Sequence, residues 1–308
     1  YLPGKLNILA LGFKNIISAI GLSIYAFIKN PDIIYSRDEL SLYILSFFKK
    51  NLIYETHRFS NTRKFFYKRF IKKDLKLVVI TDHLKDDLVK VGFRPENILT
   101  APDGVDLDQF SLDISQNEAR DKLNLPQNKK IIAYTGHLFE WKGAHLLLEV
   151  ARNFQSLDVL FVFVGGMPQD IENFKKKAAG LSSVLILGQR PYGEIPFFLK
   201  AADVLILPNS AREEISRLYT SPLKLFEYMA SGRPIIASDL PSIREILNPN
   251  NALLVTPDNP ELLAEKIRII LSDENLQYSL SAQALELVQN YTWQKRAERI
   301  RAYILTHV

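Results

Sequence analysis

The sequence predicts an α/β protein with two doubly wound domains. Short apolar runs alternate with segments of helical period along most of the chain, and such alternation is typical of parallel sheets covered by helices. The 308 residues are enough for two hydrophobic cores. Apolar residues make up 47% and charged residues 24% of the chain, as in ordinary globular proteins.

The composition excludes several kinds of site. The chain has no cysteine, which rules out disulfides and thiolate metal sites and fits a reducing compartment. Its five histidines show neither HxH nor HxxxH spacing, so we expect no metal. The net charge of +5 favours an anionic ligand or surface without requiring nucleic acid.

We expect the first domain over residues 1–115. Residues 15–29 are mostly apolar but too short to cross a bilayer, and no signal-peptide cleavage site follows them, so we interpret them as a buried helix. Strands are expected at 32–36, 52–55, 77–81 and 98–100, and helices at 40–50 and 82–91.

The second domain is expected over residues 116–290. Its strands are predicted at 130–135, 158–165, 184–188, 204–208, 234–238 and 253–255. Its helices are predicted at 117–123, 144–154, 169–179, 194–201, 222–231, 242–247 and 260–271, and terminal helices follow from residue 275 to 308.

Residues 58–76 form a basic and aromatic run whose only acid is Asp74. A surface helix that packs its aromatic side chains inward fits this pattern. A helix on anionic lipid fits it as well, and both interpretations stay open. Nucleic acid would match the charge, but no recognition motif accompanies the run.

The stretch from Tyr219 to Asp239 reads as loop, helix, turn and strand. Pro222 suits the first helical turn, and Gly232 suits a left-handed cap at its end. The apolar residues of the helix recur at helical spacing and are expected to form a buried stripe: Leu223, Phe226, Met229 and Ala230.

Two charged residues in this helix predict a nucleotide site. Lys224 and Glu227 are three apart and share a face. The N–H groups at the helix start suit a phosphate, and the Glu227 carboxylate can accept hydrogen bonds from two hydroxyls. This pairing suits a nucleotide diphosphate and its ribose.

The segment SPLKLFEYMASGRPIIASDLPSIREIL, residues 221–247, resembles the signature of family-4 glycosyltransferases, retaining enzymes of the two-domain GT-B fold. The resemblance implies two Rossmann-like domains facing a cleft, with Glu227 on the donor ribose. The family often has a second Glu eight positions earlier. This chain has Tyr219 there, as does a subgroup with YTSPLKLFEYMASG wording.

The resemblance extends to the first domain through DIIYSRD and YETH. It implies that His57, at the end of YETH, lies near the transferred sugar. Taken alone, a histidine after a strand is more often a satisfied loop residue. The resemblance also implies that residues 291–308 pack back toward the first domain.

The loop GHLFEWKG, residues 136–143, follows a strand and enters a helix, which is a phosphate-binding geometry. It is neither GxGxxG nor a P-loop. The resemblance implies that Lys142 contacts the donor diphosphate and that Arg190 lies near the base or phosphate. The remaining donor contacts that we predict are Gly136, His137, Ser221, Leu223 and Lys224.

We therefore predict a metal-independent hexosyltransferase in which Lys142 and Lys224 stabilise the leaving diphosphate. The expected donor is a UDP- or GDP-sugar, and the acceptor is a saccharide or lipid-linked molecule of cell-surface glycan synthesis. Because no carboxylate pair supports double displacement, a front-face retaining mechanism is favoured.

The sequence departs from the family pattern near the N-terminus. Family members begin with a strand and a Gly-rich loop, and neither has a match before Pro31. We expect a shortened first domain and, as an alternative function, a catalytically impaired nucleotide-sugar binding protein. The expected location is cytoplasmic, with possible peripheral contact at the inner membrane face through residues 58–76. Nucleic acid is not expected as a partner.

Overall fold

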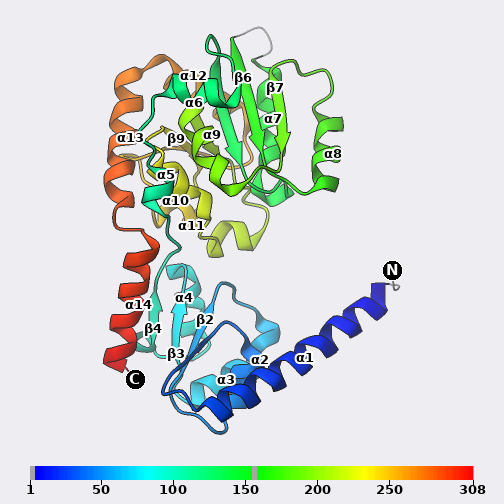
Figure 1. The fold of residues 1–308 in the computed structure, drawn as a ribbon, viewed down its shortest axis with the longest axis vertical. Helices are drawn as coiled ribbons and strands as arrows, with labels where there is room; N and C mark the ends of the chain where they lie inside the picture. The colour runs from blue at the N-terminus through cyan, green and yellow to red at the C-terminus, as the bar shows by residue number, and fades with distance from the viewer. Residues whose placement is uncertain (1–3, 155–157, 308) are drawn as a thin grey trace. The chain divides into compact units, whose positions relative to one another are not determined.

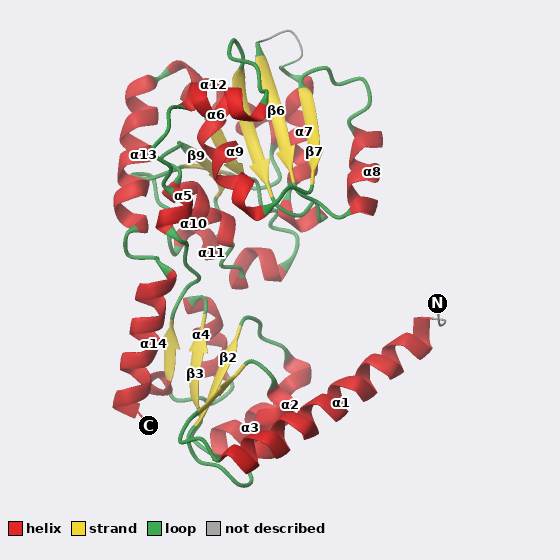
Figure 2. Ribbon diagram, viewed as in Figure 1, coloured by secondary structure: helices red, strands yellow, loops and turns green. Residues whose placement is uncertain are grey.

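The computed structural model describes residues 4–154 and 158–307. Residues 1–3, 155–157 and 308, which the predicted domains include, lie outside this range. The chain divides into two compact units (Figure 1), one of residues 1–101 with 297–308 and one of residues 102–296. Each unit holds a parallel sheet with helices packed on it (Figure 2), as predicted for a two-domain α/β protein.

The first unit contains four parallel strands in the order β1-β2-β3-β4. Its elements in chain order are α1 (Gly4–Lys29), β1 (Ile34–Ser36), α2 (Glu39–Leu45), β2 (Leu52–Thr56), α3 (Lys64–Lys72), β3 (Lys76–Val79), α4 (Asp82–Lys90) and β4 (Ile98–Thr100). Ile53 and Val78 of the sheet pack against Ile300 of α14 (Trp293–His307), so the end of the chain completes this core.

The expectation of a buried helix at residues 15–29 is wrong in its burial. Among residues 14–29 only Ala19 and Ser23 are buried, while Ile17, Tyr25 and Phe27 are at least half exposed. The reason is that α1 is apolar around its circumference, so its periodicity does not mark one buried face, and the short helix α2 covers only a narrow strip. No helix in the described part of the chain is long and apolar enough to cross a membrane.

The helix α3 carries part of the basic and aromatic run. Tyr67 and Phe70 of this helix are buried, whereas its residues Lys64, Lys68 and Lys72 are exposed. This arrangement is that of a surface helix that packs two of its aromatic side chains inward, while Phe65 is 63% exposed.

The second unit contains six parallel strands in the order β10-β9-β8-β5-β6-β7. Its strands are β5 (Lys130–Thr135), β6 (Val159–Val164), β7 (Val184–Gly188), β8 (Val204–Leu207), β9 (Ile235–Ser238) and β10 (Leu253–Val255). Numbered from β5, this is the 3-2-1-4-5-6 order of Rossmann folds, which bind ligands where the strand order reverses, between β5 and β8.

Helices cover both faces of this sheet. They are α5 (Leu107–Phe110), α6 (Gln116–Leu123), α7 (Ala144–Arg152), α8 (Pro168–Lys177), α9 (Ile195–Ala201), α10 (Leu223–Ala230), α11 (Pro241–Arg244), α12 (Pro260–Ser272) and α13 (Glu274–Val288). Along β5, Ile131 and Ala133 face one core and Ile132 and Tyr134 face the other. All four are buried, as expected for a strand covered on both sides.

The observed division of the chain differs from the predicted boundaries at 115 and 290. Residues 102–115 pack with the second unit because Val105 and Phe110 belong to its core. The Val105 N–H also donates to the Tyr291 carbonyl at 2.9 Å, which holds residues up to 296 in that unit.

Candidate functional site

One pocket of the second unit collects most of the predicted site residues. It has a volume of about 770 Å³ and lies at the carboxyl ends of β5, β6 and β7, beside the start of α10. Seven predicted residues line it: Gly136, His137, Lys142, Arg190, Leu223, Lys224 and Glu227. We call it the donor pocket.

Two predicted site residues do not line this pocket. Ser221 accepts a hydrogen bond at its hydroxyl from the Asp103 N–H at 3.0 Å, so it fastens the loop before α10 to the segment after β4. His57 belongs to the first unit and is described there.

The helix α10 supplies two of the pocket's charged groups. It begins after Pro222, with no side-chain cap, and Gly232 follows it in the predicted left-handed conformation at φ 67°. Phe226 is buried as predicted, but Leu223 is 46% exposed. Leu223 occupies the first turn and lines the pocket, so this member of the predicted stripe is a correction.

Lys224 is the most unusual cation in the pocket. Its side chain is buried, and its ammonium has no hydrogen-bond partner among the described residues. The nitrogen lies 3.8 Å from the centroid of the Tyr134 ring, whose face attracts a cation. Burial lowers the pKa of Lys224 well below its usual value, and the charge of Lys142 lowers it further.

Lys142 belongs to the loop after β5 and lies at the end of the short turn Glu140–Lys142. Its nitrogen is 4.0 Å from the centroid of the Trp141 ring. Burial lowers the pKa of Lys142 to about 8. Two desolvated cations thus line one pocket, an arrangement that favours an anion carrying more than one charge.

Glu227 faces the pocket with one carboxylate oxygen engaged. Its Oε1 accepts a hydrogen bond of 3.0 Å from the hydroxyl of Tyr192, which follows β7. Burial raises the pKa of Glu227, and the bonds from Tyr192 and the charge of Lys224 oppose that rise. The sequence analysis missed Tyr192, because only the fold brings residue 192 beside residue 227.

Replacing Tyr192 with Phe should weaken nucleotide binding about tenfold and make it more sensitive to acid. Without the hydroxyl the pKa of Glu227 rises, so the carboxyl is protonated at a higher pH and loses an acceptor. The aromatic ring is retained, and its centroid lies 5.5 Å from the centroid of the Phe110 ring. Calorimetric titration with UDP at pH 7.5 and 5.5 tests this, and an unchanged ratio of the two affinities would contradict it.

Gly143 lets the loop after β5 pass close to the end of β8. Its φ is +74°, and a Cβ atom there would lie 1.7 Å from the Pro208 carbonyl oxygen. A side chain at this position must therefore displace backbone, and the shift would reach the adjacent Lys142.

We expect Gly143→Ala to destabilise the protein by about 3 kcal/mol or more and lower the melting temperature by roughly 6–12 °C. Gly180→Ala is the matched control, since Gly180 has φ +83° but open space around its Cβ position. It should cost only the backbone strain, about 1 kcal/mol. Equal melting temperatures for the two variants would refute the steric argument.

The pocket contains a second glycine-rich turn that the sequence analysis did not use. Gly165 and Gly166 follow β6 at positive φ, and a Cβ at Gly165 would lie 2.5 Å from the Gly136 carbonyl oxygen. The signal was the Gly-Gly pair placed directly after a buried strand.

In the first unit, His57 lies at the end of β2 between two charged partners. Its Nδ1 is 2.9 Å from the Arg37 guanidinium, and its Nε2 is 2.6 Å from the Glu55 carboxylate. Because arginine can only donate, Nδ1 accepts and the Nε2 proton points to Glu55. Both ring nitrogens are therefore engaged within the unit.

Asp203 forms no part of the pocket. It forms a buried ion pair with Arg120 at 2.7 Å. Tyr219, at the position of the family's other Glu, is buried, and its hydroxyl lies 3.5 Å from Glu214.

These features define a class of protein. Two Rossmann-like domains, the second with a cationic pocket beside the carboxyl ends of its strands, form the architecture of GT-B glycosyltransferases. A family model for group 1 glycosyl transferases matches residues 115–287, more than half of the chain. The chain belongs to this family.

Individual relatives are distant. A D-inositol 3-phosphate glycosyltransferase of Corynebacterium urealyticum is 24% identical over 269 residues, which cover 82% of this chain and 62% of that protein. The chain thus spans less than two thirds of that relative's length. A glycosyltransferase from Rickettsia africae superposes with a TM-score of 0.79 at 20% identity, covering 96% of this chain and 83% of its own. HepE of Anabaena in complex with UDP also gives a TM-score of 0.79, at 19% identity and 94% and 82% coverage.

Proposed function

We propose that this protein is a retaining hexosyltransferase that moves a sugar from a UDP- or GDP-sugar to a saccharide or lipid-linked acceptor in cell-surface glycan synthesis. One observation supports it most: Lys224, whose ammonium has no hydrogen-bond partner within residues 4–154 and 158–307, and the partly desolvated Lys142 line the same pocket as Glu227. HepE, a protein of similar fold, has UDP bound in its structure, which favours uracil among the bases.

In this proposal the donor diphosphate lies against Lys142, Lys224 and the first N–H groups of α10. As the bond from sugar to phosphate breaks, negative charge grows on the diphosphate and these cations stabilise it. No divalent metal is required for that role. The ribose hydroxyls bind Glu227, whose position Tyr192 holds. The diphosphate itself removes the acceptor proton, and the sugar keeps its anomeric configuration.

Calorimetry with UDP, GDP and ADP and their sugars tests donor binding. We expect one nucleotide to bind selectively, and Glu227→Ala and Lys142→Ala each to weaken it at least about tenfold. Glu149→Ala, on the exposed face of α7, is the control and should leave affinity unchanged. Equal affinity of all three variants for every nucleotide would place the donor elsewhere and end the proposal.

Transfer assays then separate enzyme from binding protein. Turnover of the bound donor onto glycan primers or lipid extracts in the presence of EDTA, with a product of unchanged anomeric configuration by NMR, is the outcome expected for the enzyme. Donor binding without transfer or hydrolysis would favour the impaired binding protein. One observation on this chain favours that second function: Arg37 and Glu55 engage both ring nitrogens of His57.

We also propose a cytoplasmic location with peripheral contact at the inner membrane face through residues 58–76. The exposed Lys64, Lys68 and Lys72 on α3 supply the charge for anionic lipid, and the exposed Phe65 supplies an apolar group beside them. The protein should sediment together with phosphatidylglycerol vesicles. It should remain in the supernatant when these lysines are changed to Glu.

A further inference from the structure

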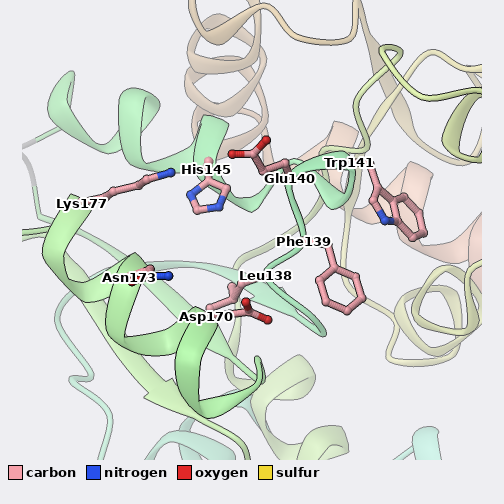
Figure 3. Close-up of a pocket in the computed structure, with 8 residues that line it drawn as sticks. All are labelled: Leu138, Phe139, Glu140, Trp141, His145, Asp170, Asn173 and Lys177. Carbon is pink, nitrogen blue, oxygen red and sulfur yellow. The ribbon is translucent and has the colours of Figure 1, made fainter. Parts of the chain in front are cut away.

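A second cavity, of about 460 Å³, lies in the same unit as the donor pocket (Figure 3). The loop segment 138–141 forms one wall. His145 of α7, with Asp170, Asn173 and Lys177 of α8, forms the other. We call it the α8 groove. It shares no lining residue with the donor pocket, although both border the loop after β5.

The polar side of the α8 groove is a regular feature of α8. Asp170, Asn173 and Lys177 are spaced i, i+3 and i+7 and therefore lie on one face of the helix. Figure 3 shows this face turned toward the loop that carries Leu138 and Glu140. A carboxylate, an amide and an ammonium thus stand in a row along one side of the cavity.

Two buried polar atoms in the groove have no hydrogen-bond partner in the described part of the chain. They are Oδ2 of Asp170 and Nδ1 of His145. Buried polar groups in proteins are almost always hydrogen-bonded, so these two atoms are available to a molecule that enters the groove, either water or a ligand. Burial and the charge of Lys177 lower the pKa of His145, while the charge of Glu140, a backbone interaction with Leu138 and the charge of Asp170 oppose this decrease. The neutral ring has one donor and one acceptor nitrogen.

The charges restrict what that molecule is. Glu140 and Asp170 both border the groove, against the single cation Lys177, so a phosphate or carboxylate ligand would meet net repulsion. Within residues 4–154 and 158–307 no cluster of three or more His, Cys, Asp or Glu residues could hold a metal ion. The ligand is therefore neither a simple anion nor a coordinated cation.

The groove lining offers both donors and acceptors, and hydroxyl groups match it because each hydroxyl both donates and accepts. Leu138 and Phe139, the latter 38% exposed, supply an apolar wall for the C–H face of a sugar ring. We propose that the α8 groove binds a short neutral saccharide, at a site separate from the donor pocket.

Saturation-transfer NMR with neutral oligosaccharides tests this directly. The panel is maltotriose, cellotriose, mannotriose and tri-N-acetylchitotriose. Trp141 lines the groove and is one of two tryptophans, so a Trp293→Phe background makes its fluorescence a second, local readout. We expect at least one sugar to give saturable signals in both measurements, and no response to any of them would overturn the proposal.

The double variant Asp170→Ala with Asn173→Ala should weaken that response about tenfold or more. The matched control is Gln169→Ala with Glu172→Ala, which removes one amide and one carboxylate at the same spacing from another face of α8. The control should retain the affinity of the parent, and thermal melts check that both doubles are folded. Equal affinities of the two doubles would overturn the proposal.

A final arm separates the α8 groove from the donor pocket. The sugar signal should persist with saturating UDP and in Glu227→Ala. Loss of the signal under either condition would mean that the sugar occupies the donor pocket, and the separate site would then be refuted.

Discussion

Replacing Lys224 with Met should abolish most nucleotide binding and at the same time stabilise the protein. The lysine side chain is buried, and its ammonium has no hydrogen-bond partner among the described residues. It thus bears the cost of desolvation without the compensation of an ion pair. Methionine fills a similar volume without a charge, so we expect a gain of about 1–2 kcal/mol in the free energy of unfolding.

The loss of affinity should be roughly 100-fold for a nucleoside diphosphate, because a desolvated cation facing a phosphate makes a strong charge-assisted hydrogen bond. Calorimetry gives the affinity, and urea unfolding gives the stability. Lys176→Met, at an exposed position of α8, is the control and should change neither. A destabilised Lys224→Met variant with normal affinity would show that the lysine is structural.

The same residue predicts a proton uptake on binding. Burial holds the pKa of Lys224 low in the free protein, and an adjacent phosphate raises it. At a pH above the pKa that Lys224 has in the free protein, the lysine must therefore take up a proton when the nucleotide binds. The affinity for the nucleotide then falls as the pH rises. Titrations of wild type and Lys224→Met in two buffers of different ionisation enthalpy measure this uptake, which the variant should lack.

Replacing Asp203 with Ala should cost about 3–5 kcal/mol of stability, because it leaves a charged guanidinium buried without its partner. Arg120 and Asp203 have side chains that are 5% and 10% exposed and are joined at 2.7 Å. Asp203 also accepts from the Ile131 N–H at 2.6 Å, so it links α6 to the first strand of the second sheet. Urea unfolding measures the loss.

The surface offers a matched comparison for this ion pair. Asp239 and Arg244 also form an Asp–Arg pair, but their side chains are 32% and 53% exposed, and Asp239→Ala should cost at most about 1 kcal/mol. A double change of Arg120 and Asp203 to Leu should recover much of the loss, since the uncompensated charge is then absent. A single Asp203→Ala variant as stable as Asp239→Ala would disprove the structural role of this pair.

Most strands and helices, and most of the residues that line the donor pocket, could be predicted from the sequence. Runs of apolar residues at period 2 or 3.6 specify a strand or a helix through local packing, so β5, β7 and β10 have their predicted bounds. The loop of residues 136–143 and the start of α10 could be predicted for the same reason, because each is a continuous segment of a few residues. Lys142, Lys224 and Glu227 line one pocket. All three could be predicted as donor contacts without any knowledge of the strand order.

Which distant residues meet could be learned only from the tertiary structure. Tyr192, after β7, contacts Glu227 of α10, and Arg120 of α6 contacts Asp203 just before β8, although the members of each pair are far apart in the sequence. The tertiary structure also shows that most of residues 14–29 of α1 are exposed and that residues 102–115 pack with the second unit. Such outcomes depend on which surfaces remain to be covered after the sheets form, and hydrophobic periodicity in one segment carries no information about its partner.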